Sequence, residues 1–294
     1  MSFSFSQRSR VAHQVRETAA RQIEAALTDS RAGEDFDRTV HQLRRRCKKI
    51  RGLLRLVGPN FRHYDREDAA FRHAADALSA SRDATVILET FQGLEKRGAL
   101  QELPSEITQN LRWELEESAR RVARAEDRVA LLIGFGDAMV AARARVEGWS
   151  FKAKGFALIE PGLADTYERL RNQMRIAQRA GSDEAFHDWR KAAKGHWFHI
   201  ALFKASAPER LGAREDQFDR LGEYLGDHHN LAVLGERLLA LGGPLDERLA
   251  KVIEERKARL ADKAFALGRQ LTIENPAELA VQFKKFWKLL PKDT

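Results

Sequence analysis

Two nine-residue stretches, VHQLRRRCK at residues 40–48 and FHDWRKAAK at residues 186–194, decide how this chain is organised. Each reads as an apolar residue, His, two further residues, Arg, a basic residue, two further residues and Lys. The second copy follows the first by 146 residues, counted from His41 to His187. A single short match of this kind indicates little, so a second matched pair is needed before a repeat is inferred.

A second pair of stretches supplies that match. LSASRDATV at residues 78–86 aligns with LGDHHNLAV at residues 225–233, and the offset from Arg82 to His229 is 147 residues. Because both pairs occur in the same order at nearly the same offset, the sequence predicts an internally duplicated unit of about four helices.

The pattern along the whole chain predicts an all-α fold. Apolar residues recur at intervals of three and four, Ala, Leu, Arg and Glu dominate, and no alternating β-rich run appears. The least regular segment, 148–160, predicts a boundary between a first half, 1–148, and a second half, 149–294, with the C-terminal helix added to the second. Helices are expected over 6–29, 35–57, 65–95, 104–147, 161–180, 183–205, 209–240, 244–270 and 275–290.

The first motif belongs to a stretch with strongly one-sided charge. Residues 38–55 contain eight Arg and Lys and no acid. On a helix with about 100° per residue, His41 shares one side with most of these cations, while the apolar residues fall on the other side. Arg46 does not fit the basic side. The cations that share the side of His41 are Arg44, Arg45, Lys48, Arg51 and Arg55.

The second motif repeats this arrangement. His187 shares its side of the helix with Arg190, Lys191 and Lys194, whereas Trp189, Ile200 and Phe203 fall opposite. His196 also falls on the apolar side, and we expect it in the core rather than among ligand-binding residues.

Such basic faces favour an extended anion as the partner. Like charges three or four residues apart repel each other on a helix, and an approaching polyanion compensates that repulsion. Arg and Lys bind phosphate oxygens, and His can gain a proton beside an anion, so affinity should strengthen as pH falls from about 8 to 6. Further basic positions that could contribute are Arg16 and, with Tyr167 on one helix face, Arg171 and Arg175.

Composition narrows the class of protein. The chain has 294 residues, a formal net charge of +8 and one Cys, which excludes a disulfide framework and a thiolate zinc site. It shows no apolar run long enough to span a membrane and no secretory leader, so we expect a cytoplasmic protein. The net charge favours an anionic partner but does not identify it.

The duplicated His-x-x-Arg-basic-x-x-Lys helix, the later Leu-x-x-x-Arg-Asp-x-x-Val stretch and GLADTYERLR at 162–171 resemble the CHAD domain, the conserved histidine α-helical domain. The resemblance implies two four-helix bundles related by a pseudo-two-fold axis. It also implies a basic groove or pore that binds inorganic polyphosphate, and targeting to polyphosphate granules. The positions it implicates are His41, Arg44, Arg45, Lys48, His187, Arg190, Lys191 and Lys194, with Arg16, Arg51, Arg55, Arg82, Arg171 and Arg175 as additional contacts.

The same resemblance leads us to expect binding without catalysis and without a cofactor. Some CHAD domains are fused to a CYTH triphosphatase, but the Glu-x-Glu-x-Lys signature of that enzyme is absent from this chain, which predicts a stand-alone protein. Enzymes of polyphosphate metabolism are possible partners. One departure affects symmetry: Arg82-Asp83 in the first half corresponds to His229-Asn230 in the second, so Asp83, but not Asn230, offers a charged acceptor for a basic site residue.

Three other functions compete with this interpretation. His187-Asp188 matches part of an HD phosphohydrolase, and Glu184 with His187 matches half of a di-iron helix, yet the position equivalent to Glu184 in the first copy is Arg38. A nucleic-acid backbone carries the same charge pattern, although only Trp197 and Phe198 extend a basic face with aromatic rings. Finally, the amphipathic stretch at 283–290 could dock a partner protein instead of packing on a bundle.

Overall fold

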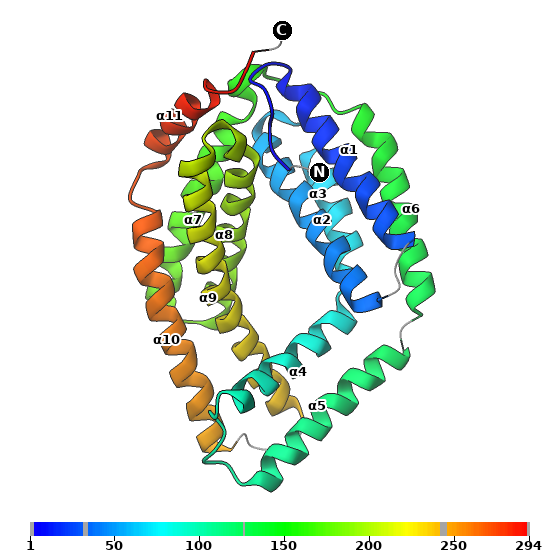
Figure 1. Cartoon of the computed structure of the whole chain (residues 1–294), viewed down its shortest axis with the longest axis vertical. Coiled ribbons are helices and arrows are strands. Elements are labelled where there is room, and N and C mark those ends of the chain that lie inside the picture. The colour runs from blue at the N-terminus through cyan, green and yellow to red at the C-terminus, as the bar shows by residue number, and fades with distance from the viewer. Residues whose placement is uncertain (1–2, 32–34, 126, 242–245, 293–294) are drawn as a thin grey trace.

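The computed structural model describes residues 3–31, 35–125, 127–241 and 246–292, except for the side chains of residues 80–82 and 125. These residues contain helices and no strand, which confirms the all-α prediction. The elongated arrangement is shown in Figure 1. The α-helices are α1 (Val11–Arg31), α2 (Phe36–Val57), α3 (Tyr64–Asp76), α4 (Ala80–Lys96), α5 (Ser105–Ala125), α6 (Arg128–Glu147), α7 (Glu160–Ala180), α8 (Asp183–Phe203), α9 (Pro208–Ala240), α10 (Glu247–Leu271) and α11 (Pro276–Trp287).

Several helix ends follow the local sequence closely. Helix α7 ends at Gly181, whose φ of 61° lies in the left-handed region that glycine adopts without strain. The Ser182 hydroxyl then accepts the Ala185 N–H at 3.3 Å and begins α8. At the start of α11, Asn275 and Glu278 each accept the other's backbone N–H at 2.9 Å, a reciprocal capping box.

Two of the predicted helices, 65–95 and 104–147, are wrong, because each consists of two helices separated by a break. At the first break the Ser79 hydroxyl donates to the Asp76 carbonyl at 2.6 Å and satisfies an acceptor near the end of α3. At the second, the Asp127 carboxylate accepts a backbone N–H of the first turn of α6 at 2.9 Å. Neither break contains Gly or Pro, the residues used to place boundaries in the sequence.

Two sets of helices share one large core. Helix α1 packs on α2 and α6, and α2 packs on α3, while α7, α8, α9 and α10 pack in sequence order. Helix α2 also packs against α7 and α8, so buried side chains form one continuous cluster from the N-terminal segment to the C-terminal helix. Helix α11 packs on α7 and buries Phe283 and Trp287, the C-terminal aromatic residues. A boundary at residue 148 stays a prediction.

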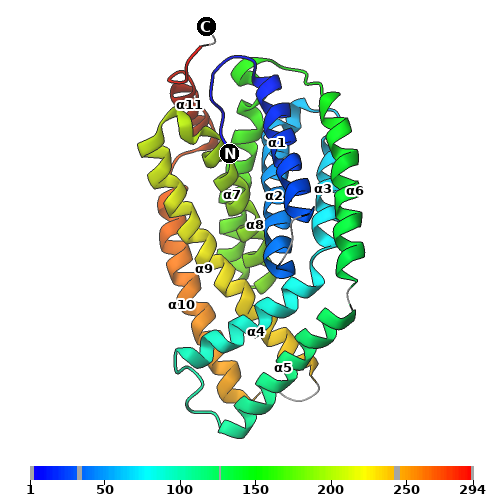
Figure 2. The same ribbon diagram turned by 45° about the vertical axis from the view of Figure 1, so that its right-hand side comes forward.

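A second, smaller core joins the two halves at the other end of the molecule. Helices α4 and α5 belong to the first half, but α4 packs against α9 (Figures 1 and 2). Phe91, Leu94 and Leu115 from α4 and α5 form a buried cluster with Leu234 of α9 and Ile253 of α10. The halves are therefore attached both where α2 meets α7 and α8 and where α4 and α5 meet α9 and α10.

Small residues permit the close crossing of α2 with the second half. A Cβ at Gly52 would lie 2.6 Å from Phe198 Cβ, and one at Gly162 would clash with the Leu56 carbonyl oxygen. At the same crossing His199 Nε2 lies 3.0 Å from the Gly52 carbonyl oxygen and is fully buried. This contact fixes α8 against α2 and sets the position of their basic faces.

Among the described residues, no helix combines the length and the apolar character that a membrane span requires.

Candidate anion-binding site

The face of α2 predicted to be basic is directed away from the core. His41, Arg45 and Lys48 are exposed, whereas Leu43 and Ile50 on the opposite side are fully buried. Arg46, which did not fit the basic side, forms an ion pair of 2.6 Å with Asp29 of α1. The helical wheel is thus confirmed for α2, and its one misfit is explained by a neighbouring helix.

The corresponding basic face of α8 is also directed away from the core. Trp189, Ile200 and Phe203 are fully buried, while the cations of the motif reach the surface. His196 is also fully buried, between aromatic rings that include Tyr167 and Phe218, which confirms its expected place in the core.

The two basic faces approach each other around Lys48. Burial, followed by the charges of Arg44, Arg190 and Lys194, lowers the pKa of Lys48 to about 8, while Asp83 opposes the shift. The side chain touches water, yet enough protein surrounds it to weaken its hydration. Cations of both α2 and α8 therefore act on Lys48.

Arg190 forms no ion pair with an acid among the described residues. Burial lowers its pKa, and its Nε is enclosed with no hydrogen-bond partner in the described part of the chain. Two glycines one turn apart on α9 lie beside the α8 cations. A Cβ at Gly226 would make an ordinary contact, at 3.6 Å, with Arg190 Nε, whereas one at Gly222 would lie 2.8 Å from Cε of the flexible Lys194 side chain.

Other cations of the two motifs have protein partners. Lys191 pairs with Asp188 at 3.0 Å, and Lys194 pairs with Asp219 at 3.2 Å while its Nζ lies 4.4 Å from the Trp197 ring centroid. These acids are at least 40% exposed, so the α8 ion pairs are weak and solvated.

On α2, the hydrogen-bond partners of Arg44 and Arg51 come from α3. Arg44 donates to the Ala75 carbonyl at 2.6 Å, near the end of α3 where carbonyl oxygens lack helical partners. Arg51 donates two hydrogen bonds, of 2.8 and 3.0 Å, to Asp68, and both side chains are largely buried. Arg55 lies close to this pair, and burial, then the charge of Arg51, lowers its pKa.

Three of the additional contact positions are Arg16, Arg171 and Arg175. In the described residues, no interaction connects their side chains with Lys48 or Arg190. Arg16 donates to the Trp149 carbonyl at 2.9 Å and ties α1 to the loop after α6. On α7, Arg175 donates to Asn172 at 3.2 Å, and the charge of Arg171 acts on Tyr167. The side chain of Arg82 lies outside the described residues.

Tyr167 is not a surface residue, contrary to its grouping with Arg171 and Arg175. It is fully buried, and its hydroxyl lies 3.2 Å from the Leu271 carbonyl and 3.1 Å from a Glu274 oxygen, with which it forms hydrogen bonds. Its helical phase placed it beside the arginines, but an aromatic ring at the edge of that face turns into the core.

A pair of histidines adds to the site. The rings of His187 and His229 lie 4.3 Å apart, and burial lowers the pKa of both, that of His229 to about 4. The charges of Lys191 and Arg190 lower the pKa of His187 further, so both rings are neutral in the free protein at pH 7. His229 was not among the predicted contacts, although its alignment with Arg82 in the repeat pointed to it.

No group of three or more His, Cys, Asp or Glu residues suited to a metal ion occurs in the described part of the chain. The competing HD interpretation centred on His187, and the nearest charged groups to its ring include two cations, Lys191 and Arg190. The groups that converge at this site are suited to binding oxygen anions.

Comparison with known proteins places the chain in a family. The sequence model of the CHAD domain matches residues 14–239. This chain is a CHAD protein. The CHAD fold is also found in a similar solved structure, the crystal structure of the CHAD domain from the plant Ricinus communis, with a TM-score of 0.55 and 16% sequence identity over 97% of this chain and 95% of that chain. No curated protein matches the sequence.

Proposed function

We propose that this CHAD protein binds inorganic polyphosphate, without catalysis, between the basic faces of α2 and α8. The observation that carries the proposal is the convergence of Lys48 with Arg190 and Lys194, where Arg190 has an enclosed Nε without a hydrogen-bond partner and forms no ion pair in the described residues. An enclosed, unpaired charge is unfavourable in the free protein, and a bound anion removes that penalty. The association of the CHAD family with polyphosphate supports the same ligand.

Each group has a distinct part in this binding. Arg190 offers a planar fork to two phosphate oxygens, and Lys48 and Lys194 act as compact charges along the chain. Neutral His187 and His229 donate hydrogen bonds and gain protons as phosphate charge approaches. Many weak contacts with one polymer add up, and binding releases counterions from the ligand, so affinity should rise with chain length and fall with salt.

The cellular setting follows from the ligand. We propose a cytoplasmic protein that gathers on polyphosphate granules and lies close to enzymes that make or degrade the polymer. Cofactors have no part in this binding, because every group it uses belongs to the chain itself.

A competition measurement tests the proposal. Long-chain polyphosphate, tripolyphosphate, single-stranded DNA and double-stranded RNA compete for the full chain at several salt concentrations. We expect long polyphosphate to bind most tightly at every salt concentration. Equal affinity for nucleic acid of the same charge would overturn the proposal in favour of a nucleic-acid-binding protein.

A double variant locates the site. Arg44→Glu with Lys194→Glu places an acid on each face and should abolish polyphosphate binding, while circular dichroism shows unchanged helix content. The matched control, Arg120→Glu with Arg259→Glu, changes the net charge equally at two exposed arginines of α5 and α10, whose ion pairs within the described residues are with acids of their own helices. Equal loss in both double variants would mean that net charge, and not this site, controls binding.

A further inference from the structure

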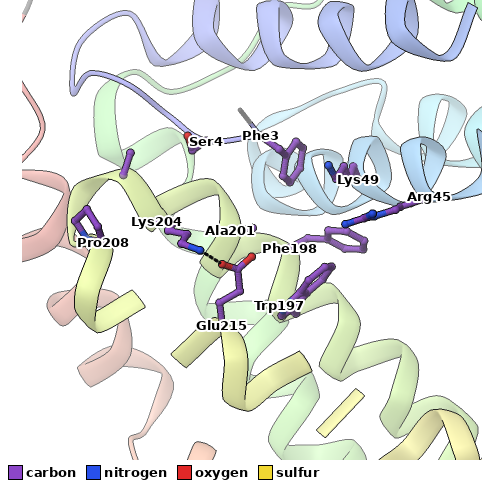
Figure 3. A pocket seen from close by; sticks show the side chains of 11 residues that line it. Phe3, Ser4, Arg45, Lys49, Trp197, Phe198, Ala201, Lys204, Pro208 and Glu215 are labelled. Atoms are coloured by element: carbon purple, nitrogen blue, oxygen red, sulfur yellow. Dashed lines mark ion pairs between the residues drawn. The ribbon is translucent and has the colours of Figure 1, made fainter. Parts of the chain in front are cut away.

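A pocket of about 310 Å³ lies beside the α2–α8 crossing (Figure 3). Three aromatic side chains line it: Phe3 from the N-terminal segment, and Trp197 and Phe198 from α8. The Trp197 and Phe198 ring centroids lie 5.0 Å apart, and Phe3 meets Phe198 edge to face at 6.2 Å. Inorganic polyphosphate has no apolar part to place against these rings.

Cations connect the pocket to the proposed polyphosphate site. Arg45 and Lys49 of α2 line one side and flank Lys48 in the sequence. The Lys49 Nζ lies 5.3 Å from the Phe3 ring centroid, and burial, then the charges of Arg45 and Arg46, lowers its pKa. On α8, Lys194 lies over the ring of Trp197. A ligand seated in the pocket would thus reach cations of both basic faces.

The opposite wall of the pocket carries an acid. Glu215 of α9 pairs with Lys204 at 2.8 Å, and Figure 3 shows its carboxylate between Lys204 and Phe198. A carboxylate repels phosphate, but it accepts hydrogen bonds from amino and hydroxyl groups. The pocket therefore combines an acceptor, Glu215, which is paired with Lys204 and close enough to oppose the pKa shift of Lys49, with cations at Arg45 and Lys49 that suit phosphate.

We propose that this pocket is a subsite for the base and sugar of a nucleoside polyphosphate, whose phosphates extend over Arg45 and Lys49 toward Lys48. Stacking on the partly exposed Trp197 would hold the base, with the buried Phe198 as part of the pocket wall. Glu215 would accept hydrogen bonds from the amino group or the sugar hydroxyls. The volume is at the lower end of small-molecule pockets, about 300–1,000 Å³, and suits one base with its sugar. The inference rests on the proposed function for the placement of the phosphates.

Isothermal titration of the full chain with ATP and with tripolyphosphate, in EDTA, tests the subsite. Each ligand carries three phosphates, and ATP has the smaller negative charge, so charge alone predicts weaker binding of ATP. We expect ATP to bind about tenfold more tightly, the effect of roughly one stacked base. Equal affinity, or a preference for tripolyphosphate, would overturn the inference.

Trp197→Ala should bring the ratio of the two affinities close to one, and Trp197→Phe should retain part of it. The ratio is the useful quantity, because any change transmitted through Lys194 affects both ligands. Trp113→Ala is the matched control, since Trp113 is 57% exposed on α5 and lies outside the pocket. A ratio that survives Trp197→Ala, with circular dichroism unchanged, would also overturn the inference.

Two further ligands separate this inference from the proposed function. If long polyphosphate binds while ATP shows no preference over tripolyphosphate, only the subsite is wrong. If ATP binds in a manner dependent on Trp197 and long polyphosphate does not bind, the subsite stands and the proposed function fails. An adenine-only RNA oligomer that binds far more tightly than ATP would assign the pocket to RNA instead.

Discussion

The basic faces of α2 and α8 carry matched cations, but the protein holds these cations in different ways. On α2, Arg44, the counterpart of Arg190, donates to the Ala75 carbonyl at 2.6 Å. Arg51, which aligns with Trp197 and has no cationic counterpart on α8, is fixed by two hydrogen bonds to the largely buried Asp68. On α8, Arg190 is enclosed without an acid among the described residues, and Lys191 pairs only with an exposed acid of its own helix. A shared motif therefore determines where the charges lie. The neighbouring helices determine which of these charges remain without a protein partner and can contact a ligand.

The largest expected effect distinguishes Arg190, which forms no ion pair in the described residues, from Arg51, which is paired with Asp68. Arg190→Met should weaken polyphosphate binding by about tenfold or more, because a charge-assisted contact is lost. It should also raise the melting temperature of the free protein, since an enclosed, unpaired charge is removed. Fluorescence anisotropy with labelled polyphosphate and thermal denaturation measure the two effects.

Arg51→Met is the comparison variant on α2. It leaves Asp68 partly buried without its partner, so stability should fall by about 1–3 kcal/mol, while affinity changes much less than in Arg190→Met. If both variants lose affinity and stability in parallel, the two faces do not differ in the way described.

A smaller effect concerns the titration of Lys48. Its pKa in the folded protein is about 8, below the ordinary value of 10.5, so the charged form is disfavoured by folding. As pH rises from about 8 toward 10.5, the folded protein releases this proton before the unfolded chain does, and stability increases. Lys48→Met should therefore be more stable than the wild type at pH 7, with a difference in melting temperature that shrinks by pH 9.5.

Binding of an anion reverses this shift. At pH 8 about half of the free protein carries a neutral Lys48, so polyphosphate binding should take up roughly half a proton at this residue. Calorimetry in buffers of different ionisation enthalpy measures the uptake, and Lys48→Met should remove that share. If affinity still strengthens between pH 8 and 6 in Lys48→Met, the remaining effect comes from protonation of His187 and His229. Because the pKa values of both histidines are lowered, this effect should be largest near pH 6.

The smallest expected effect comes from the exposed acids of the second face. Asp188→Asn and Asp219→Asn free Lys191 and Lys194 from solvated ion pairs, and each should strengthen polyphosphate binding by about twofold at low salt. The gain should vanish at high salt, because the charges are screened. Weaker binding in these variants would mean that the acids orient the lysines for the ligand.

Periodicity predicted the helices, the basic faces and the buried side of each face, because all three depend on residues within a few turns. It could not predict the break at Asp127, where a lone capping carboxylate ends a run of helix-forming residues. It also could not predict the ion pair of Arg51 with Asp68, because Asp68 lies 17 residues away on another helix.

The small core formed by α4, α5, α9 and α10 holds the two halves together at a second place. Without it, mutual repulsion of two cationic surfaces would favour separation of α2 from α8 over much of their length. With the halves fastened at both ends, apolar packing opposes that repulsion before any ligand arrives. An anion that enters between the faces finds its contacts already assembled, and little of its binding free energy is consumed in closing them around it.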